Sequence, residues 1–275
     1  MVVKAADKQL AGTAFSVSGE GPPLILVHGL GLNRQMWQWQ QAALADRYTV
    51  ITYDLFGHGQ SARPAGPYTM RQMTDQICAL MAHLGLQRCA LAGFSLGGLI
   101  VQAFALAHPQ RVSALAILNA AHGRTEEERA ALMGRVQQVR EQGPASTVDA
   151  ALQRWFSPAF AARAPEVLAQ VRDWVVANDP RVYPEVYLLL ARADIGLEDA
   201  IATIQCPTLV MTGEEDYGNS PAMSRRIAAL ISGARLEILP GLRHMALAED
   251  PARVNEILLG FLSDALMEEE AKAQA

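Results

Sequence analysis

Few cysteines and no metal-ligand spacing limit what this sequence can build. Cys78, Cys89 and Cys206 are the three cysteines, and each lies in apolar surroundings rather than in a paired motif. They do not supply the framework of a small disulfide-rich protein, and the sequence has neither an H-E-x-x-H motif nor paired Cys and His ligands. We therefore expect no metal, no other cofactor, and buried thiols in a reducing cytoplasm.

Long hydrophobic runs and an excess of positive charge are also absent. The longest apolar runs are too short to span a bilayer, and residues 1–4 do not begin the apolar segment of a signal peptide. Acidic residues number 28 against 23 lysines and arginines, and the net charge of −5 argues against a nucleic-acid partner. We expect a cytoplasmic protein that acts on a small molecule, without a membrane partner. Monomer and dimer both remain open.

The chain is long and rich in apolar residues. Its 275 residues, of which 51 % are hydrophobic, suit one large domain or a core with an inserted subdomain. Apolar strand-like runs alternate with helical patterns, which predicts an α/β protein with a mostly parallel, twisted sheet flanked by helices. The predicted strands are residues 24–27, 48–53, 89–92, 114–118, 208–211 and 235–239.

Between the fourth and fifth predicted strands this alternation stops, and only helical patterns follow. Thr125 and the three glutamates after it are typical of a capping box, and five prolines divide the remainder into short helices. These prolines are Pro144, Pro158, Pro165, Pro180 and Pro184. We predict an α/β core made of residues 1–122 and 196–275, and a helical cap over residues 123–195. The cap should cover the carboxyl ends of the strands, where open α/β sheets bind ligands.

The segment Gly93-Phe94-Ser95-Leu96-Gly97-Gly98 lies between an apolar strand and an apolar helical run. A G-x-S-x-G sequence in that context predicts a nucleophile elbow, in which a strained turn exposes the serine hydroxyl. The glycines allow neighbouring backbone to pass close by, and the following helix directs N–H groups at a developing oxyanion. Ser95 is therefore the predicted nucleophile.

A serine hydroxyl is a weak nucleophile and needs a base that is itself oriented by an acid. In this type of site the acid and the base follow later strands, in the order Ser, Asp, His. Asp216 follows the strand at 208–211 and is the predicted acid; its neighbours Glu214 and Glu215 are alternatives that also fit a solvated loop. His244 follows the strand at 235–239 and is the predicted base.

Two backbone N–H groups should complete the site as an oxyanion hole. One is expected from Leu96, after the nucleophile, and the other from Leu30 in the loop after the first predicted strand. Among the other histidines, His122 lies at the junction with the cap and is a candidate for the pocket. The remaining ones are interpreted as structural, and they are His28, His58, His83 and His108.

Taken together, these segments resemble the α/β-hydrolase superfamily from about residue 20 to about residue 262. The matching segments are residues 28–29, 54–61, 93–98, 213–216 and 241–245. The resemblance implies the α/β-hydrolase fold, a catalytic triad of Ser95, Asp216 and His244, and a structural rather than catalytic turn at 54–61.

The cap is similar to that of 3-oxoadipate enol-lactonases. The matching segments are residues 119–121, Arg135-Val136 with Val139 and Gly143, residues 154–160, and residues 187–194. The sequence departs from that family at Phe94, where a small or polar residue is expected, and at Gly123, where a larger one is expected. The resemblance implies a substrate that carries a carboxylate, which an arginine among Arg135, Arg140 and Arg154 should bind. Arg135, Arg154 and Trp155 are, with His122, the candidate substrate-binding residues. Ion pairs with cap glutamates and plain packing are the structural alternatives.

We therefore predict a serine hydrolase that cleaves a small ester or lactone through an acyl-enzyme, with a carboxylated enol-lactone such as 3-oxoadipate enol-lactone as the leading substrate. Two alternatives remain open because the elbow does not fix the bond that is cleaved. One is a C–C bond or amide hydrolase of the same fold in aromatic or heterocycle catabolism. The other is a slow-turnover protein that senses a small ligand.

Overall fold

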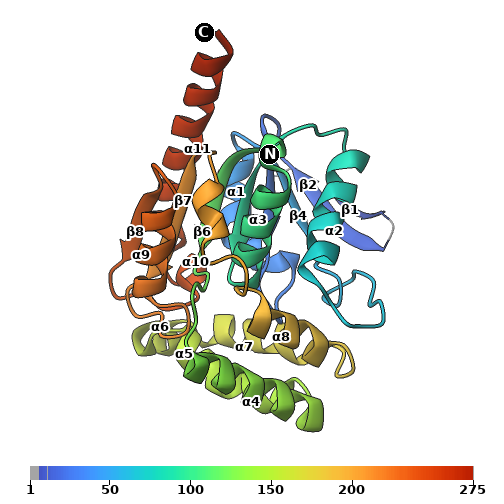
Figure 1. Ribbon diagram of the computed structural model, residues 1–275. Helices are drawn as coiled ribbons and strands as arrows, with labels where there is room; N and C mark the ends of the chain where they lie inside the picture. Colours follow the sequence, from blue (N-terminus) through green and yellow to red (C-terminus); the bar gives the residue numbers. More distant parts are fainter. Residues whose placement is uncertain (1–5, 11, 275) are drawn as a thin grey trace.

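One eight-stranded sheet forms the centre of the molecule (Figure 1). The computed structural model describes residues 6–10 and 12–274. The sheet order is β1-β2-β4-β3-β5-β6-β7-β8, in which β1, β2 and β4 pair antiparallel and all other pairs are parallel. The strands are β1 (Ala6–Leu10), β2 (Thr13–Ser18), β3 (Pro23–Val27), β4 (Thr49–Tyr53), β5 (Cys89–Phe94), β6 (Val112–Leu118), β7 (Thr208–Gly213) and β8 (Arg235–Leu239). The predicted fold class is confirmed.

The predicted strands correspond to β3 to β8. All six are present within two residues of their expected limits. β3 and β5 are short apolar runs that are almost fully buried, whereas β8 is mostly half-buried. The first two strands were not predicted. β1 reads Ala-Asp-Lys-Gln-Leu and pairs only with β2, so it is a polar edge strand without the apolar alternation that marks a buried one.

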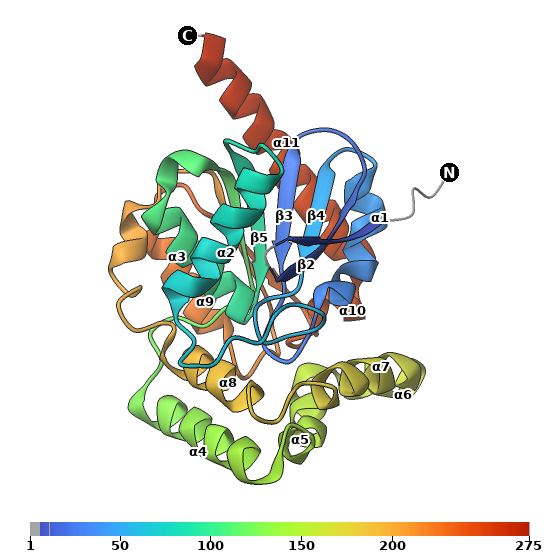
Figure 2. The same ribbon diagram turned by 90° about the vertical axis from the view of Figure 1, so that its right-hand side faces the viewer.

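Helices cover both faces of the sheet (Figure 2). One face carries α1 (Gln38–Ala45), α10 (Ala246–Glu249) and α11 (Pro251–Gln274), and the other carries α2 (Met70–His83), α3 (Leu96–Ala107) and α9 (Pro221–Leu230). Short 3-10 helices lie at Arg34–Trp37, Pro109–Arg111 and Ala200–Thr203. In the part of the chain that the structure describes, no helix is long and apolar enough to cross a membrane.

Five further helices lie together beyond the carboxyl ends of the strands (Figures 1 and 2), and we call them the cap helices. They are α4 (Glu126–Gln142), α5 (Ala145–Trp155), α6 (Pro158–Arg163), α7 (Pro165–Val176) and α8 (Tyr183–Arg192). Thr125 forms the predicted capping box with Glu128 at the start of α4. Prolines stand at the start of the four following helices, where the missing N–H is not needed. The boundaries 123–195 remain a prediction.

The three cysteines differ in burial. None forms a disulfide, and burial raises the pKa of the Cys89 thiol to about 12. Cys78 and Cys206 are only half-buried, so the expectation that all three thiols are buried is wrong for these two. Cys78 lies within α2, and Cys206 lies in the segment between the 3-10 helix at Ala200–Thr203 and β7.

Candidate active site

Ser95 stands at a strained turn between β5 and α3. Its φ of 55° and ψ of −114° lie outside the conformations that a serine ordinarily adopts. A Cβ at Gly97 would lie 2.1 Å from the carbonyl oxygen of Val27, and one at Gly93 would lie 2.2 Å from that of Gly97. Only glycine fits at these positions, so the turn that the motif predicts follows from its two glycines.

Asp216 and His244 lie side by side at the ends of β7 and β8. The Nδ1–H of His244 donates to Oδ2 of Asp216 at 2.7 Å, which leaves Nε2 as the free ring nitrogen. The alternative acids point elsewhere: Glu214 accepts from the N–H of Gly241 at 3.1 Å, and Glu215 pairs with Arg243 at 3.3 Å. The structure thus brings Asp216, and neither glutamate, to the histidine.

Asp216 is held by four donors in all. Besides His244, its Oδ1 accepts from the N–H groups of Gly218 at 3.1 Å and Asn219 at 2.9 Å, and its Oδ2 accepts from Nδ2 of Asn119 at 3.0 Å. Burial by itself would raise the pKa of Asp216, but His244 and these donors outweigh burial and lower it. Asp216 is therefore an ionised carboxylate in a buried site.

Two asparagines in this network were not recognised as part of the site from the sequence. Asn119 follows β6 with a φ of 49°, and its carbonyl accepts from the side chain of Asn219. A positive φ is one that asparagine tolerates better than most residues. The position of Asn119 at a strand end was the available signal, whereas nothing in the sequence around Asn219 connects it to residue 119.

The predicted oxyanion donors occupy suitable places. Leu30 follows β3 and lines the cavity, and Leu96 is the first residue of α3, directly after Ser95. Within residues 6–10 and 12–274, no hydrogen-bond acceptor is found for either backbone N–H. Both groups are therefore available to an oxygen atom bound at Ser95.

Two buried histidines fix the loop that carries Leu30. The N–H of Gly31 donates to Nε2 of His58 at 2.9 Å, and the N–H of Leu55 donates to Nε2 of His28 at 2.9 Å. Both rings act as acceptors, so both must be neutral. Burial lowers the pKa of His28 to about 4 and that of His58 to about 3, which keeps them neutral at physiological pH.

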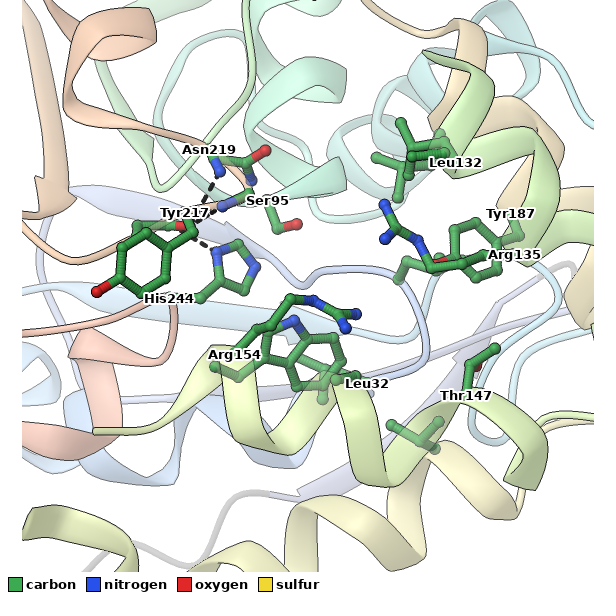
Figure 3. A pocket seen from close by; sticks show the side chains of 18 of the residues that line it. Leu32, Ser95, Leu132, Arg135, Thr147, Arg154, Tyr187, Tyr217, Asn219 and His244 are labelled. Atoms are coloured by element: carbon green, nitrogen blue, oxygen red, sulfur yellow. Dashed lines mark hydrogen bonds and ion pairs between the residues drawn. The ribbon is translucent and has the colours of Figure 1, made fainter. Parts of the chain in front are cut away.

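A cavity of about 270 Å³ lies between the strand ends and the cap helices (Figure 3). Ser95, Asp216 and His244 line it from the sheet. Its walls come mainly from the cap helices and include Leu132, Arg135, Val148, Arg154, Trp155, Tyr183 and Tyr187. The structure therefore brings the candidate nucleophile, base and acid together with Arg135, Arg154 and Trp155.

Two substrate-binding candidates do not line this cavity. His122 is buried at the junction with the cap, where its carbonyl accepts from Arg226 at 2.8 Å. Arg140 pairs with Glu185 at 2.9 Å on the outside of the cap. The structure therefore does not bring His122 to the cavity with the other candidates.

Aromatic rings flank the base. Phe94, at the position that departs from the enol-lactonase pattern, lies with its ring centroid 4.8 Å from that of His244, and Trp155 lies at 5.8 Å. Both residues line the cavity. Phe94 thus packs against one side of the imidazole within the site.

The loop that carries His244 is tied to the end of α5. The N–H of Met245 donates to the carbonyl of Trp155 at 2.9 Å, and Arg243 donates to that of Phe156 at 3.1 Å. Glu249, which is 3 % exposed, accepts from the N–H groups of Arg243 and Ser157, each at 3.0 Å. Sequence reasoning missed Glu249, since its two partners are far from each other along the chain.

The described residues contain no cluster of three or more His, Cys, Asp or Glu side chains that could hold a metal ion. The arrangement can instead perform acid–base and nucleophilic chemistry at Ser95 and His244. Its electrostatic support comes from Asp216 and from the backbone N–H groups of Leu30 and Leu96.

Comparison with known proteins gives consistent matches. Residues 22–251 match the family described as the alpha/beta hydrolase fold. The sequence is 33% identical over 234 residues to 3-oxoadipate enol-lactonase 2 of Acinetobacter baylyi, covering 85% of this chain and 86% of that protein. It is 30% identical over 244 residues to (E)-2-((N-methylformamido)methylene)succinate hydrolase of the same organism, covering 89% and 91%.

Solved structures agree with these sequence matches. The enol-lactonase from Burkholderia xenovorans has a TM-score of 0.86 and 32% identity, covering 94% of this chain and 100% of that one. A thermophilic esterase from Thermogutta terrifontis, solved with malate bound, has a TM-score of 0.85 and 28% identity, covering 96% and 99%.

Proposed function

This chain belongs to the α/β-hydrolase family, and we propose that it is a serine hydrolase which cleaves a small carboxylated ester or lactone. The observation that carries the proposal is the 2.7 Å contact between His244 and Asp216 in the same cavity as the strained Ser95 turn. We also propose that it acts in the cytoplasm. The three cysteines support this location because none of them forms a disulfide.

Catalysis proceeds in two halves. Nε2 of His244 removes the proton of Ser95 as Oγ attacks the acyl carbon, and the N–H groups of Leu30 and Leu96 bind the oxyanion. Asp216 stabilises the imidazolium and holds its tautomer. His244 then protonates the departing oxygen, which leaves an acyl-enzyme on Ser95. A water molecule, deprotonated by His244, attacks that ester and releases the acid, and the proton returns to Ser95.

Two features support a small, carboxylated substrate. The cavity of about 270 Å³ has room for a small molecule only, and Arg135 and Arg154 line it. Guanidinium groups bind carboxylates through paired hydrogen bonds. A relative that is 33% identical is named as an enol-lactonase, which supports a carboxylated enol-lactone as the leading substrate.

Replacement of Ser95 by alanine tests the reaction type. With an activated ester as substrate, we expect Ser95→Ala to lose on the order of 10³-fold or more in kcat while it unfolds at the same temperature. A fluorophosphonate should label wild-type Ser95 and leave the variant unlabelled. The exposed Ser232 provides the control, and Ser232→Ala should keep full activity. Half of the activity remaining in Ser95→Ala would refute the proposal.

A second candidate is hydrolysis of an amide in a small carboxylated compound. The relative that is 30% identical is named as a hydrolase of (E)-2-((N-methylformamido)methylene)succinate, and this name favours amide hydrolysis. A matched pair of carboxylated ester and amide, compared by kcat/KM, separates the two candidates. A ligand sensor would turn over neither.

A further inference from the structure

Three side chains from three cap helices meet at one end of the cavity. Arg135 comes from α4, Arg154 from α5 and Tyr187 from α8, and we call them the cationic end. Figure 3 shows the two guanidinium groups extending into the cavity, with the Tyr187 ring beside Arg135. We infer that the cationic end binds two carboxylates at once, so that the preferred substrates are dianionic acyl compounds. This inference rests on the proposed function, and it replaces 3-oxoadipate enol-lactone, which carries one free carboxylate, with an ester or lactone that carries two.

The two arginines differ from their neighbours in having no acidic partner. Arg124 and Arg129 share Asp194 at 2.9 and 2.8 Å. In the part of the chain that the structure describes, neither Arg135 nor Arg154 forms an ion pair. The Nε atom of Arg135 is buried without a hydrogen-bond partner. A buried donor left unpaired is costly unless a ligand satisfies it.

Among the described residues, the acids that line the cavity form no ion pair with either arginine. Glu128 accepts from the N–H of Thr125 at 2.8 Å within the capping box of α4. Asp216 is occupied by His244 and its other donors. Two positive charges therefore face the same small space, and burial and the charge of Arg135 lower the pKa of Arg154.

Charge balance decides how many anionic groups fit. A monoanion leaves one guanidinium uncompensated in a partly dehydrated cavity, whereas a dianion pairs with both. Each guanidinium can present two parallel N–H donors to one carboxylate. Tyr187 remains a neutral phenol and adds a donor, because burial raises its pKa while both arginines oppose that shift. The oxyanion donors lie apart, on Leu30 and Leu96, so these arginines serve carboxylates that the substrate carries before cleavage.

The test measures binding without catalysis. The Ser95→Ala protein is titrated by calorimetry with succinate and butyrate, and with glutarate and valerate, which are pairs of equal chain length. We expect each dicarboxylate to bind at least tenfold more tightly than its matched monocarboxylate. In Arg135→Ala and in Arg154→Ala that preference should fall to about one. Tyr187→Phe should weaken dicarboxylate binding severalfold.

Arg140→Ala is the matched control, since Arg140 lies on the same helix as Arg135 but pairs with Glu185 outside the cavity. It should keep the full preference. Equal binding of succinate and butyrate overturns the inference, as does an undiminished preference in either arginine variant. If an alanine variant does not fold, Arg135→Gln or Arg154→Gln replaces it. The comparison of succinate with butyrate in the Ser95→Ala protein alone still decides whether the cavity prefers dicarboxylates.

These outcomes are separable from those of the proposed function. If wild-type Ser95 proves dispensable for hydrolysis but dicarboxylates still bind preferentially, the serine mechanism fails and the cationic end stands. If Ser95 is essential and the preference is absent, the substrate class is wrong and the mechanism stands.

Discussion

Replacing Asp216 with asparagine should stop the reaction through the tautomer of His244. The structure determines which way the new amide turns. Its oxygen must stay with the two backbone N–H groups of Gly218 and Asn219, because the opposite orientation would leave both without an acceptor. The NH₂ group then faces Nδ1 of His244, which must give up its proton to accept. The proton moves to Nε2, so the ring can no longer act as a base toward Ser95.

The expected loss in kcat is about 10⁴-fold, as for the equivalent change in a serine-protease triad, which corresponds to about 5 kcal/mol of transition-state free energy. The same NH₂ group also meets the Nδ2 donor of Asn119, so the free energy of unfolding should fall by ~1–3 kcal/mol. Steady-state kinetics on an activated ester and urea unfolding measure the two effects. Glu215→Gln is the control and should lose less than threefold in kcat. If Asp216→Asn keeps a tenth of the activity, or if Glu215→Gln is the more damaging change, the assignment of the acid is wrong.

Three further predictions concern the surroundings of the site. Glu249→Gln should lower the free energy of unfolding, measured in urea, by ~1–3 kcal/mol, because one of the two backbone N–H groups that donate to Glu249 loses its acceptor. Ser157→Ala should lower the free energy of unfolding by less. The reverse order would contradict the role given to Glu249. Burial holds the pKa of His28 at about 4, below its ordinary 6.5, so the unfolded chain binds more protons between these values. Stability should therefore fall as pH drops from 6.5 to 4, and His28 alone should contribute up to about 3 kcal/mol to that loss, to which His58 adds. That loss should appear in denaturant titrations at several pH values, and a flat profile would refute the neutral ring. Gly97→Ala should give insoluble or inactive protein, since its Cβ would lie 2.1 Å from a carbonyl oxygen. Gly134→Ala, on the exposed side of α4 with nothing within 4 Å, should raise stability by ~0.5–1 kcal/mol, and equal behaviour of the two variants would argue against the close approach at Gly97.

Ser95, Asp216 and His244 could be chosen from the sequence because each lies shortly after a predicted strand. An apolar run of five or six residues is recognisable locally, and the order of the strands then places their ends at one edge of the sheet. No long-range information is needed for that inference. The edge strand β1 and its neighbour β2, which mixes apolar residues with threonine and serine, lack such a run, and the sequence therefore did not reveal them.

The residues that support the site depend on contacts that the sequence does not encode locally. Asn119 reaches Asp216 because β6 pairs with β7 in a register that sets Leu118 beside Met211. Glu249 and Ser157 are 92 residues apart and meet only after the cap has folded back. Such pairings follow from tertiary packing, which single-sequence patterns do not specify.

The choice among the cap arginines could have been narrowed by helix geometry. Arg135 and Arg140 lie five residues apart on α4, which is roughly 140° around the helix axis, so both cannot face one cavity. Which of the two faces inward depends on how α4 packs against α8, and the structure shows that it is Arg135.

The hydrogen bonds between the end of α5 and the loop of His244 bear on how far caps can be exchanged between relatives. Replacing residues 123–195 with the cap of a relative would remove the carbonyls of Trp155 and Phe156, which accept hydrogen bonds from Met245 and Arg243. A foreign cap would have to present the same acceptors, or the imidazole would lose part of its support although no core residue had changed. Chimeras that carry residues 243–249 along with the cap keep both halves of this junction. An exchange of the cap therefore changes the support of the His244 loop as well as the lining of the cavity.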